Sequence, residues 1–303
     1  MSAGRPDWET DGREWPNRAA SRFVRAAGLR WHIQVAGRGP VLLLAHGTGA
    51  ATHSWRGLLP LLARRFTVVA PDLPGHGFTD TPAGGRLSLP VMARALTDLV
   101  RALGLPPDLA IGHSAGAPIL ARMTLDGGIA PRAVIGLNAA LMPFEGFAGQ
   151  VFSPIARLLA GVPVVPWFFA RRAAGPGVVE RLLRDTGSAL DPQGVELYGR
   201  LVRRPAHVAA ALGMMANWDL HPLLRDLRRL KVPLVLLVGG ADRTIPPADA
   251  RRLKAMLPAL RVISLPGLGH LAHEEDPARI AGLVSGLAEE LGLVTGPASL
   301  AEA

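Results

Sequence analysis

Three residue types that together perform nucleophilic catalysis occur along this chain in a meaningful order. A serine, Ser114, stands in the stretch GHSAG directly after the apolar run LAI, and Asp242 and His270 follow it further along the chain. A serine hydroxyl is a weak nucleophile, so it needs a histidine base, and that base needs an acid that holds the right tautomer. Ser114, His270 and Asp242 are therefore candidates for a catalytic triad.

The pattern around Ser114 favours a sharp strand-to-helix turn that exposes the hydroxyl above a sheet. The flanking glycines remove β-carbon clashes, and the helix that begins there supplies its N-terminal field and a backbone N–H. Such a pattern also arises by chance in a chain with 35 glycines. The alternative is that Ser114 is only a small residue in a tight loop.

The candidate acid and base each follow an apolar run. Asp242 lies in GGADRTIP and His270 lies in LPGLGHLAHEEDP. Sites in open α/β sheets gather at the carboxyl ends of strands, which is where both residues are expected. Asp242 could instead cap a helix that begins near Pro247, and His270 could be an ordinary loop histidine. His273 competes for the role of base, but Gly269 favours His270 because the chain can turn there.

A glycine-rich turn, AHGTGA at residues 45–50, follows another apolar run. It can aim backbone N–H groups at a carbonyl oxygen, and one such donor stabilises a transition state by about 3 kcal/mol. We expect an oxyanion hole formed by the N–H groups of Thr48 and Ala115, with Gly49 as the alternative to Thr48. His113, on the sharp turn, is expected to point away from the substrate.

Apolar runs that alternate with helical patterns predict a mostly parallel sheet with helices on its faces. A hairpin is expected over residues 21–37, because Ala27-Gly28 separates two strand patterns. The expected strands, with their following loops, are 41–47, 66–77, 109–112, 133–139, 232–240 and 260–267, and the expected helices are 55–64, 89–104, 119–125, 247–257 and 277–291.

The alternation stops between Leu141 and Pro222, where no clear strand pattern occurs. The expected organisation is a polar leader (1–18), an α/β core (19–140 and 223–296), a helical cap (141–222) inserted after the sixth strand, and a tail (297–303).

An aromatic cluster in the cap, Trp167, Phe168 and Phe169, is a candidate apolar lid that contacts the substrate. The alternative is a cap that packs on its own core. In a third interpretation the cluster touches a membrane or a flat ligand, where Arg171 and Arg172 would suit anionic lipid headgroups.

Composition excludes several classes of protein. The chain has no cysteine, which excludes disulfides, thiolate metal sites and thiol nucleophiles. Its net charge is +9, but the arginines are scattered and aromatic residues are only 5%, so we expect no nucleic-acid partner. His46, His53 and His76 lack the spacing of a zinc-binding helix, so we expect neither a metal nor a cofactor.

The beginning of the chain is polar, carries four acidic residues within 1–18 and has no apolar segment like that of a signal peptide. We expect a loosely ordered leader and a cytoplasmic protein. The most apolar window, residues 151–170, contains three prolines, a glycine and an arginine, so no membrane-spanning helix is expected. Mild attraction to an anionic membrane surface remains open because of the positive charge.

Five stretches in succession resemble the signatures of the α/β-hydrolase fold. They are HGTG, DLPGHGFTD, GHSAG, GGADRTIP and GHLAHEEDP, and the resemblance runs from about Ser21 to Leu291. More narrowly, WPNRAASRFVRAAGLRWHIQVAG and HGTGAATHSWRGLLPLLARRFTVVAPDLPGHGFTD resemble the α/β hydrolases encoded with bacteriochlorophyll-synthesis genes, a family of magnesium-chelatase accessory proteins. That narrower resemblance implies a role in the magnesium branch of tetrapyrrole synthesis and chelatase subunits as partners.

Two function classes follow. The first is an esterase-like serine hydrolase that acts on an apolar carbonyl substrate, such as a tetrapyrrole ester. A serine in place of an aspartate argues against haloalkane dehalogenase or epoxide hydrolase chemistry, whereas perhydrolysis and C–C hydrolysis stay open. The second class is a non-catalytic porphyrin carrier or chelatase scaffold. The presence of Ser114, Asp242 and His270 together favours the first.

Overall fold

The sheet has eight strands and is mostly parallel. The structure, a computed structural model, describes residues 4–84, 86–143, 164–173, 175 and 177–295. The strand order is β1-β2-β4-β3-β5-β6-β7-β8. The strands are β1 (Ser21–Ala26), β2 (Leu29–Ala36), β3 (Val41–Ala45), β4 (Thr67–Pro71), β5 (Leu109–His113), β6 (Ala133–Leu137), β7 (Leu234–Gly239) and β8 (Arg261–Leu265).

Strands β3 to β8 run parallel to one another, and β2 joins them as an antiparallel partner of β4. The hairpin predicted from Ala27-Gly28 joins β1 to β2. Both turn residues have positive φ, 51° and 73°, as a two-residue hairpin turn requires. The parallel arrangement brings the ends of β3, β5, β7 and β8 to one edge, which is where the candidate residues follow.

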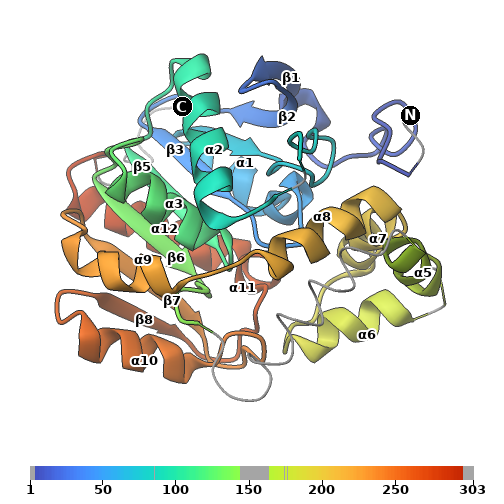
Figure 1. Cartoon of the computed structure of the whole chain (residues 1–303). Coiled ribbons are helices and arrows are strands. Elements are labelled where there is room, and N and C mark those ends of the chain that lie inside the picture. Colours follow the sequence, from blue (N-terminus) through green and yellow to red (C-terminus); the bar gives the residue numbers. More distant parts are fainter. Residues whose placement is uncertain (1–3, 85, 144–163, 174, 176, 296–303) are drawn as a thin grey trace, which may run out of the picture.

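Helices cover both faces of the sheet (Figure 1). One apolar core joins the sheet to α2 (Leu89–Leu103), α3 (Gly116–Leu125), α9 (His221–Asp226) and α10 (Pro247–Met256). A second core joins the opposite face to α1 (Leu58–Leu62) and α12 (Pro277–Glu290). The predicted α/β-hydrolase fold is therefore confirmed. Short helical turns complete the core: η1 (Arg18–Ala20), η2 (Thr52–Trp55), η3 (Leu227–Arg229) and α11 (Ala272–Glu275).

The described part of the segment between β6 and β7 is helical. It contains α5 (Val164–Ala173), α6 (Val178–Asp185), α7 (Pro192–Val202) and α8 (Pro205–Ala216), which lie beside the sheet (Figure 1) and are called the cap below. No helix in the described ranges is long and apolar enough to cross a membrane.

The leader, for which the sequence predicts loose order, is anchored to the core. Trp15 is 2% exposed, and its Nε1 donates to Thr52 Oγ1 at 2.9 Å. The ring of Trp8 packs edge-on against Phe23 and Phe78. The polar composition of the leader gives no sign of these contacts, because only two aromatic side chains, Trp8 and Trp15, make them.

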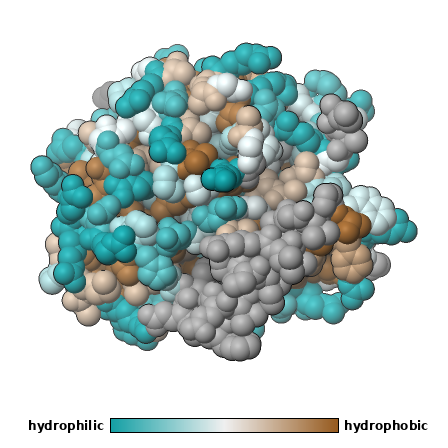
Figure 2. Space-filling model, viewed as in Figure 1, coloured by the Kyte–Doolittle hydropathy of each residue, from teal (hydrophilic) through white to brown (hydrophobic). Residues whose placement is uncertain are grey.

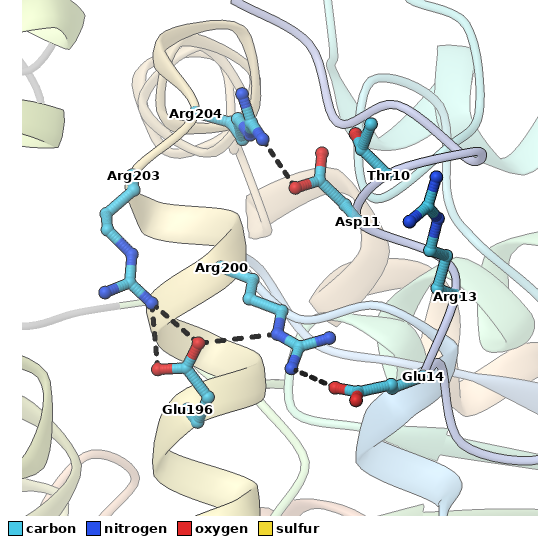
Figure 3. Close-up of a pocket in the computed structure, with 8 residues that line it drawn as sticks. All are labelled: Thr10, Asp11, Arg13, Glu14, Glu196, Arg200, Arg203 and Arg204. Carbon is cyan, nitrogen blue, oxygen red and sulfur yellow. Dashed lines mark hydrogen bonds and ion pairs between the residues drawn. The ribbon is translucent and has the colours of Figure 1, made fainter.

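The leader also contacts the cap through ion pairs. Asp11 pairs with Arg204, and Glu14 pairs with Arg200 at 2.9 Å (Figure 3). Between the two segments lies a cavity of about 550 Å³ that is lined by Thr10 and seven charged side chains, and by none of the three triad candidates. The leader thus bridges the core and the cap.

Candidate active site

The turn between β5 and α3 has the conformation that the serine motif predicts. Ser114 has a φ of 48°, a left-handed conformation that is unfavourable for a serine. A β-carbon at Gly112 would lie 2.3 Å from the Ala117 nitrogen, and one at Gly116 would lie 2.0 Å from the Ala45 carbonyl oxygen. Both glycines are therefore required for the close contact of the turn with β3 and with the first residues of α3.

The backbone of the turn is fixed by the neighbouring strand. Ser114 N–H donates to the Leu137 carbonyl at 3.0 Å, and its own carbonyl accepts from Ala140 N–H at 3.1 Å. These bonds hold the strained residue in place, so its partly exposed side chain is presented by a rigid backbone.

The carboxylate of Asp242 contacts the imidazole of His270 directly. Asp242 Oδ2 accepts from His270 Nδ1 at 2.8 Å, while Oδ1 accepts from the N–H groups of Thr244 and Ile245 at 2.8 and 2.9 Å. Because a carboxylate only accepts, Nδ1 carries the proton and Nε2 is left free to act as a base. Asp242 does not cap α10, whose N-cap is Pro246 without a side-chain hydrogen bond.

The loop that carries His270 is held on both sides of the histidine. Gly269 N–H donates to Glu275 Oε2 at 2.7 Å. Leu271 N–H donates to Ser188 Oγ at 2.8 Å, which ties the loop to the segment after α6. The backbone on either side of the imidazole is therefore fixed before a substrate arrives.

Asn138 holds the same loop from beneath. It directly follows β6, has a φ of 44° and is 2% exposed. Its amide nitrogen donates to the carbonyls of Gly269 and His270, both at 2.8 Å, and its oxygen accepts from Gly239 N–H at 2.6 Å. This one side chain joins the ends of β6 and β7 to the His270 loop.

His113 connects the nucleophile turn to the base loop. Its Nε2 donates to the His270 carbonyl at 2.9 Å, and the two rings lie 4.7 Å apart between centroids. The ring is buried, as expected for a side chain that points away from a substrate, and burial lowers its pKa well below the ordinary value. Within the described ranges Ser114 makes no hydrogen bond with His270, so the two segments meet through His113.

The competing histidine, His273, does not contact Asp242. It is fully buried between Trp55 and His113, at centroid distances of 4.6 and 4.5 Å. Neither ring nitrogen has a hydrogen-bond partner in the part of the chain that the structure describes. Burial lowers the pKa of His273 to about 3, so the ring stays neutral and packs as an aromatic group.

The glycine-rich turn after β3, residues 46–50, lies against the nucleophile and is called the oxyanion loop below. A β-carbon at Gly47 would lie 3.0 Å from Ser114 Cβ. The Gly47 carbonyl accepts from His46 Nδ1 at 2.8 Å and from Ala50 N–H at 3.2 Å. In a trans peptide the N–H points opposite to the C=O. Because the Gly47 carbonyl points at His46 Nδ1 and Ala50 N–H, the Thr48 N–H of the same peptide group points away from these two donors.

The candidate oxyanion donors have unpaired N–H groups in the described part of the chain. Among the described residues, the backbone N–H groups of Thr48, Gly49 and Ala115 have no hydrogen-bond partner. Ala115 is the N-cap residue of α3, where the helix field favours negative charge. The choice between Thr48 and Gly49 stays open.

The aromatic cluster of the cap lies on the outside of α5. Trp167, Phe168 and Phe169 are 53%, 57% and 45% exposed. Arg171 lies over the Trp167 ring at 5.5 Å. No contact links the cluster to the triad candidates within the described ranges, so its role in binding stays a hypothesis.

The histidines near the site do not form a metal centre. Within the described residues, no three or more histidine or acidic side chains are grouped so that they could hold an ion.

Comparison with known proteins identifies the class. Residues 42–283 match the sequence model of the alpha/beta hydrolase family, so the chain belongs to that family.

Individual relatives include both an enzyme and a chelatase subunit. The chain is 40% identical over 275 residues to the magnesium-chelatase 30 kDa subunit of Rhodobacter capsulatus, covering 89% of this chain and 95% of that one. It is 28% identical over 273 residues to haloalkane dehalogenase 2 of Mycobacterium tuberculosis, covering 87% and 93%. The solved structure of the epoxide hydrolase CorEH has the same fold, with a TM-score of 0.76, 21% identity and coverage of 89% and 99%.

Sequence reasoning missed the side chains that hold the site together. Asn138, Ser188 and Glu275 carry no motif of their own. One signal was present for Asn138, because it directly follows a buried strand in the same way as the triad candidates. The contacts of Ser188 and Glu275 join segments 87 residues apart, which no local pattern reveals.

Proposed function

We propose that the chain is a serine hydrolase that cleaves an ester through an acyl-enzyme. The observation that carries this proposal is the 2.8 Å hydrogen bond between Asp242 and His270, with free Nε2, beside a strained Ser114 turn. A packing role would not require a left-handed serine, a buried carboxylate and unpaired N–H groups at one edge of the sheet.

In the proposed reaction, Ser114 Oγ attacks the ester carbonyl carbon and His270 Nε2 takes its proton. The negative charge on the carbonyl oxygen is stabilised by the N–H of Ala115 and that of Thr48 or Gly49. His270 then gives the proton to the leaving alcohol. A water molecule, activated by the same Nε2, hydrolyses the acyl-enzyme and releases the acid. Asp242 stays ionised and stabilises the imidazolium in both steps.

The substrate is proposed to be an apolar ester. The nucleophile is a hydroxyl, and an alkyl-enzyme ester formed by displacement of halide or opening of an epoxide needs a carboxylate there. The proposed substrate is a flat, apolar ester of a magnesium-tetrapyrrole intermediate of bacteriochlorophyll synthesis, and the similarity to a magnesium-chelatase subunit supports this choice.

A chain-length series tests this function. We expect turnover of p-nitrophenyl esters with a preference for longer acyl chains, and loss of turnover in Ser114→Ala. Equal hydrolysis by wild type and Ser114→Ala, at the same protein concentration, would refute the proposal.

A second candidate is a non-catalytic porphyrin carrier or chelatase scaffold. The observation that favours it is the 40% identity to a protein named as a chelatase subunit. Co-purification with magnesium-chelatase subunits, together with normal pigment synthesis in cells that carry only Ser114→Ala, would select the scaffold. Loss of pigment in those cells, with the variant still present, would select the enzyme.

The exposed aromatic cluster on α5 is proposed to make a peripheral membrane contact for a cytoplasmic protein. Figure 2 shows hydrophobic surface at this edge of the cap, and the exposed Arg171 and Arg172 follow in the same helix. Aromatic rings beside basic residues suit an anionic lipid interface.

We expect binding to anionic vesicles that is lost in Phe168→Ser/Phe169→Ser. The control is Leu182→Ser, which removes an exposed apolar residue from α6. Unchanged binding of the double variant would contradict the contact.

A further inference from the structure

One cap helix, α8, lies directly against the oxyanion loop. His207 Nε2 is 3.0 Å from the Gly49 carbonyl oxygen, and Thr48 Oγ1 donates to Met214 Sδ at 3.4 Å. A β-carbon at Gly49 would lie 4.0 Å from Ala211 Cβ. Three successive turns of α8 therefore contact the two residues whose N–H groups are candidate oxyanion donors.

The protonation of His207 follows from its partners. A carbonyl oxygen only accepts, so Nε2 carries the proton and donates to Gly49. On the other side of the ring, Nδ1 accepts from Gly77 N–H at 3.1 Å. The side chain is 1% exposed, and burial lowers its pKa to about 4, which keeps it neutral. His207 is thus a bridge with one donor and one acceptor.

The bridge joins the cap to two core loops, the oxyanion loop and the loop after β4. Helix α8 also packs tightly against the loop after β4, because a β-carbon at Gly75 in that loop would lie only 2.7 Å from Ala210 Cβ. The start of α8 is also held by the leader, through Ala206 N–H to the Gly4 carbonyl at 3.0 Å. The position of α8 is therefore well defined relative to the core.

The oxyanion loop is fixed by one histidine at each end. His46, the first residue of the loop, holds the Gly47 carbonyl through Nδ1, and its Nε2 is fixed to the core because it accepts from Leu73 N–H at 2.8 Å. His207, from the cap, holds the Gly49 carbonyl. The peptide groups that contain Thr48 N–H and Gly49 N–H lie between these two fixed carbonyls. Removing the cap histidine would free one end of that short segment, and oxyanion stabilisation depends on donors that are already in position.

We infer that His207 is a positioning residue, through which the seating of the cap on the core sets the geometry of the oxyanion hole. This inference rests on the proposed serine hydrolase function. It makes the cap part of the catalytic machinery rather than only a cover, because the loop is held at both ends only when α8 is in place.

The test uses two variants of similar size. In His207→Gln the side-chain amide keeps a donor for Gly49 and an acceptor for Gly77, whereas His207→Leu keeps neither. For p-nitrophenyl ester hydrolysis we expect kcat to fall roughly 10- to 100-fold in His207→Leu and to stay within about threefold in His207→Gln, with KM little changed in both. The control is Met215→Gln, an exposed position on the same helix that should behave like the wild type.

A second readout separates positioning from a general structural role. Phenylboronic acid forms a tetrahedral serine adduct with an oxygen in the oxyanion position, so its inhibition constant should rise in parallel with the loss of kcat across the variants. A wild-type kcat in His207→Leu, or an equal loss in His207→Gln, would overturn the inference. If His207→Leu does not fold, Ala210→Val, which pushes α8 away from Gly75, should show the same selective loss of kcat.

Failure of the proposed function is recognised separately. If the wild type hydrolyses no ester, that function fails, and hydrogen exchange of the amides in residues 46–50 still tests the positioning role. We expect faster exchange of these amides in His207→Leu than in His207→Gln and Met215→Gln. Equal exchange in all three would overturn the inference.

Discussion

Two trios of serine, histidine and aspartate lie in the described part of this chain, one after strands β5, β7 and β8 and the other at strands β1, β2 and β4. The first is the candidate catalytic trio, Ser114, His270 and Asp242. In the second, His32 Nδ1 contacts Asp72 Oδ2 at 2.8 Å, and His32 Nε2 contacts Ser21 Oγ at 3.0 Å. The second trio therefore has the more complete set of triad contacts.

The backbone of the two serines differs. Ser114 has a φ of 48° at a strand-to-helix turn. Ser21 is extended, with a φ of −76°, at the start of the antiparallel edge strand β1. Its hydroxyl also accepts from Gln34 Nε2 at 3.2 Å, across the hairpin. Both serines are partly exposed. An extended strand residue with a satisfied hydroxyl is well suited to fastening strands together, and its backbone lacks the strain of the turn at Ser114.

The surroundings of the two trios differ even more. Ser114 lies beside the oxyanion loop, with unpaired N–H groups. His32 is enclosed by aromatic rings, among them Trp8 at 4.8 Å and Phe78 at 5.3 Å. Asp72 uses its other contacts to hold the N–H groups of Thr52 and Phe78. The comparison teaches that two hydrogen bonds joining a serine, a histidine and an aspartate do not define a hydrolase site. Under the proposed function, the strained turn and the free donors distinguish the trio that does chemistry from the one that does not.

The largest effect is expected from matched changes of the two acids. Asp242→Asn should lower kcat by about 10⁴-fold while the protein stays folded, because the amide favours the wrong tautomer of His270. Asp72→Asn should lower the denaturant midpoint, because it disturbs a buried carboxylate with three partners. The kcat of its folded fraction should stay within about threefold. Equal losses of kcat in both variants would remove the distinction between the trios.

A smaller effect is expected from crowding the nucleophile. An added β-carbon at Gly47 meets Ser114 Cβ at 3.0 Å and His113 Nδ1 at 2.9 Å. We expect Gly47→Ala to lower kcat roughly 100-fold, because a small misplacement of reacting groups is costly. Gly282→Ala is the control, since its β-carbon points into open space on α12. It should leave kcat unchanged and stabilise the fold by about 0.5–1 kcal/mol.

A third contrast compares the amides that support each trio. Asn138→Asp keeps the side-chain size and tolerates the left-handed backbone, but removes the donors to Gly269 and His270. We expect kcat to fall about 10-fold with KM unchanged, because the imidazole loses its fixed backbone. Gln34→Glu removes the comparable donor to Ser21. It should change only stability, and a matching loss of kcat there would contradict the account.

The smallest contrast is in the response to acid. Burial lowers the pKa of His207 to about 4 and of His273 to about 3, and the unfolded chain binds those protons near pH 6.5. Because both rings are buried in the neutral form, they do not oppose folding above about pH 6.5. The free energy of unfolding falls as the pH drops from about 6.5 toward the pKa values of the folded protein.

Asp72 behaves differently. Burial raises its pKa, but the nearby His32 and His46 and the Phe78 N–H lower it further, so the folded value lies below the ordinary one. The stabilisation of the fold by ionised Asp72 is therefore fully present above the ordinary aspartate pKa near 4. It is lost only as the pH falls below that value. Hydrogen exchange at pH 5, corrected for intrinsic rates, should therefore increase first in residues 46–50 and 270–275 and later in β1 and β2. The reverse order would contradict this assignment.

Much of the core and the order of the candidate triad could be predicted from the sequence. Buried parallel strands are continuous apolar runs, so β3, β5 and β7 were readily located, although β3 ends at Ala45 rather than Gly47. Residues that follow such runs must meet at one sheet edge, which placed Asp242 beside His270. The local glycine pattern predicted the turn at Ser114 for a purely steric reason.

The supporting contacts could not be predicted, because they join residues far apart in the chain. Asn138 and His270 are 132 residues apart, and His207 and Gly49 are 158 apart. The trio of Ser21, His32 and Asp72 gave no signal either, because a serine in an apolar-alternating strand looks like any polar strand residue.

Labelling with a fluorophosphonate, followed by peptide mapping, tests the central claim most directly, because the reagent phosphonylates a serine activated by an imidazole far faster than an ordinary serine. The account predicts a single modified peptide, containing Ser114, and labelling that disappears in Ser114→Ala but persists in Ser21→Ala. Labelling at Ser21, or none at Ser114 in the folded wild-type protein, would contradict it.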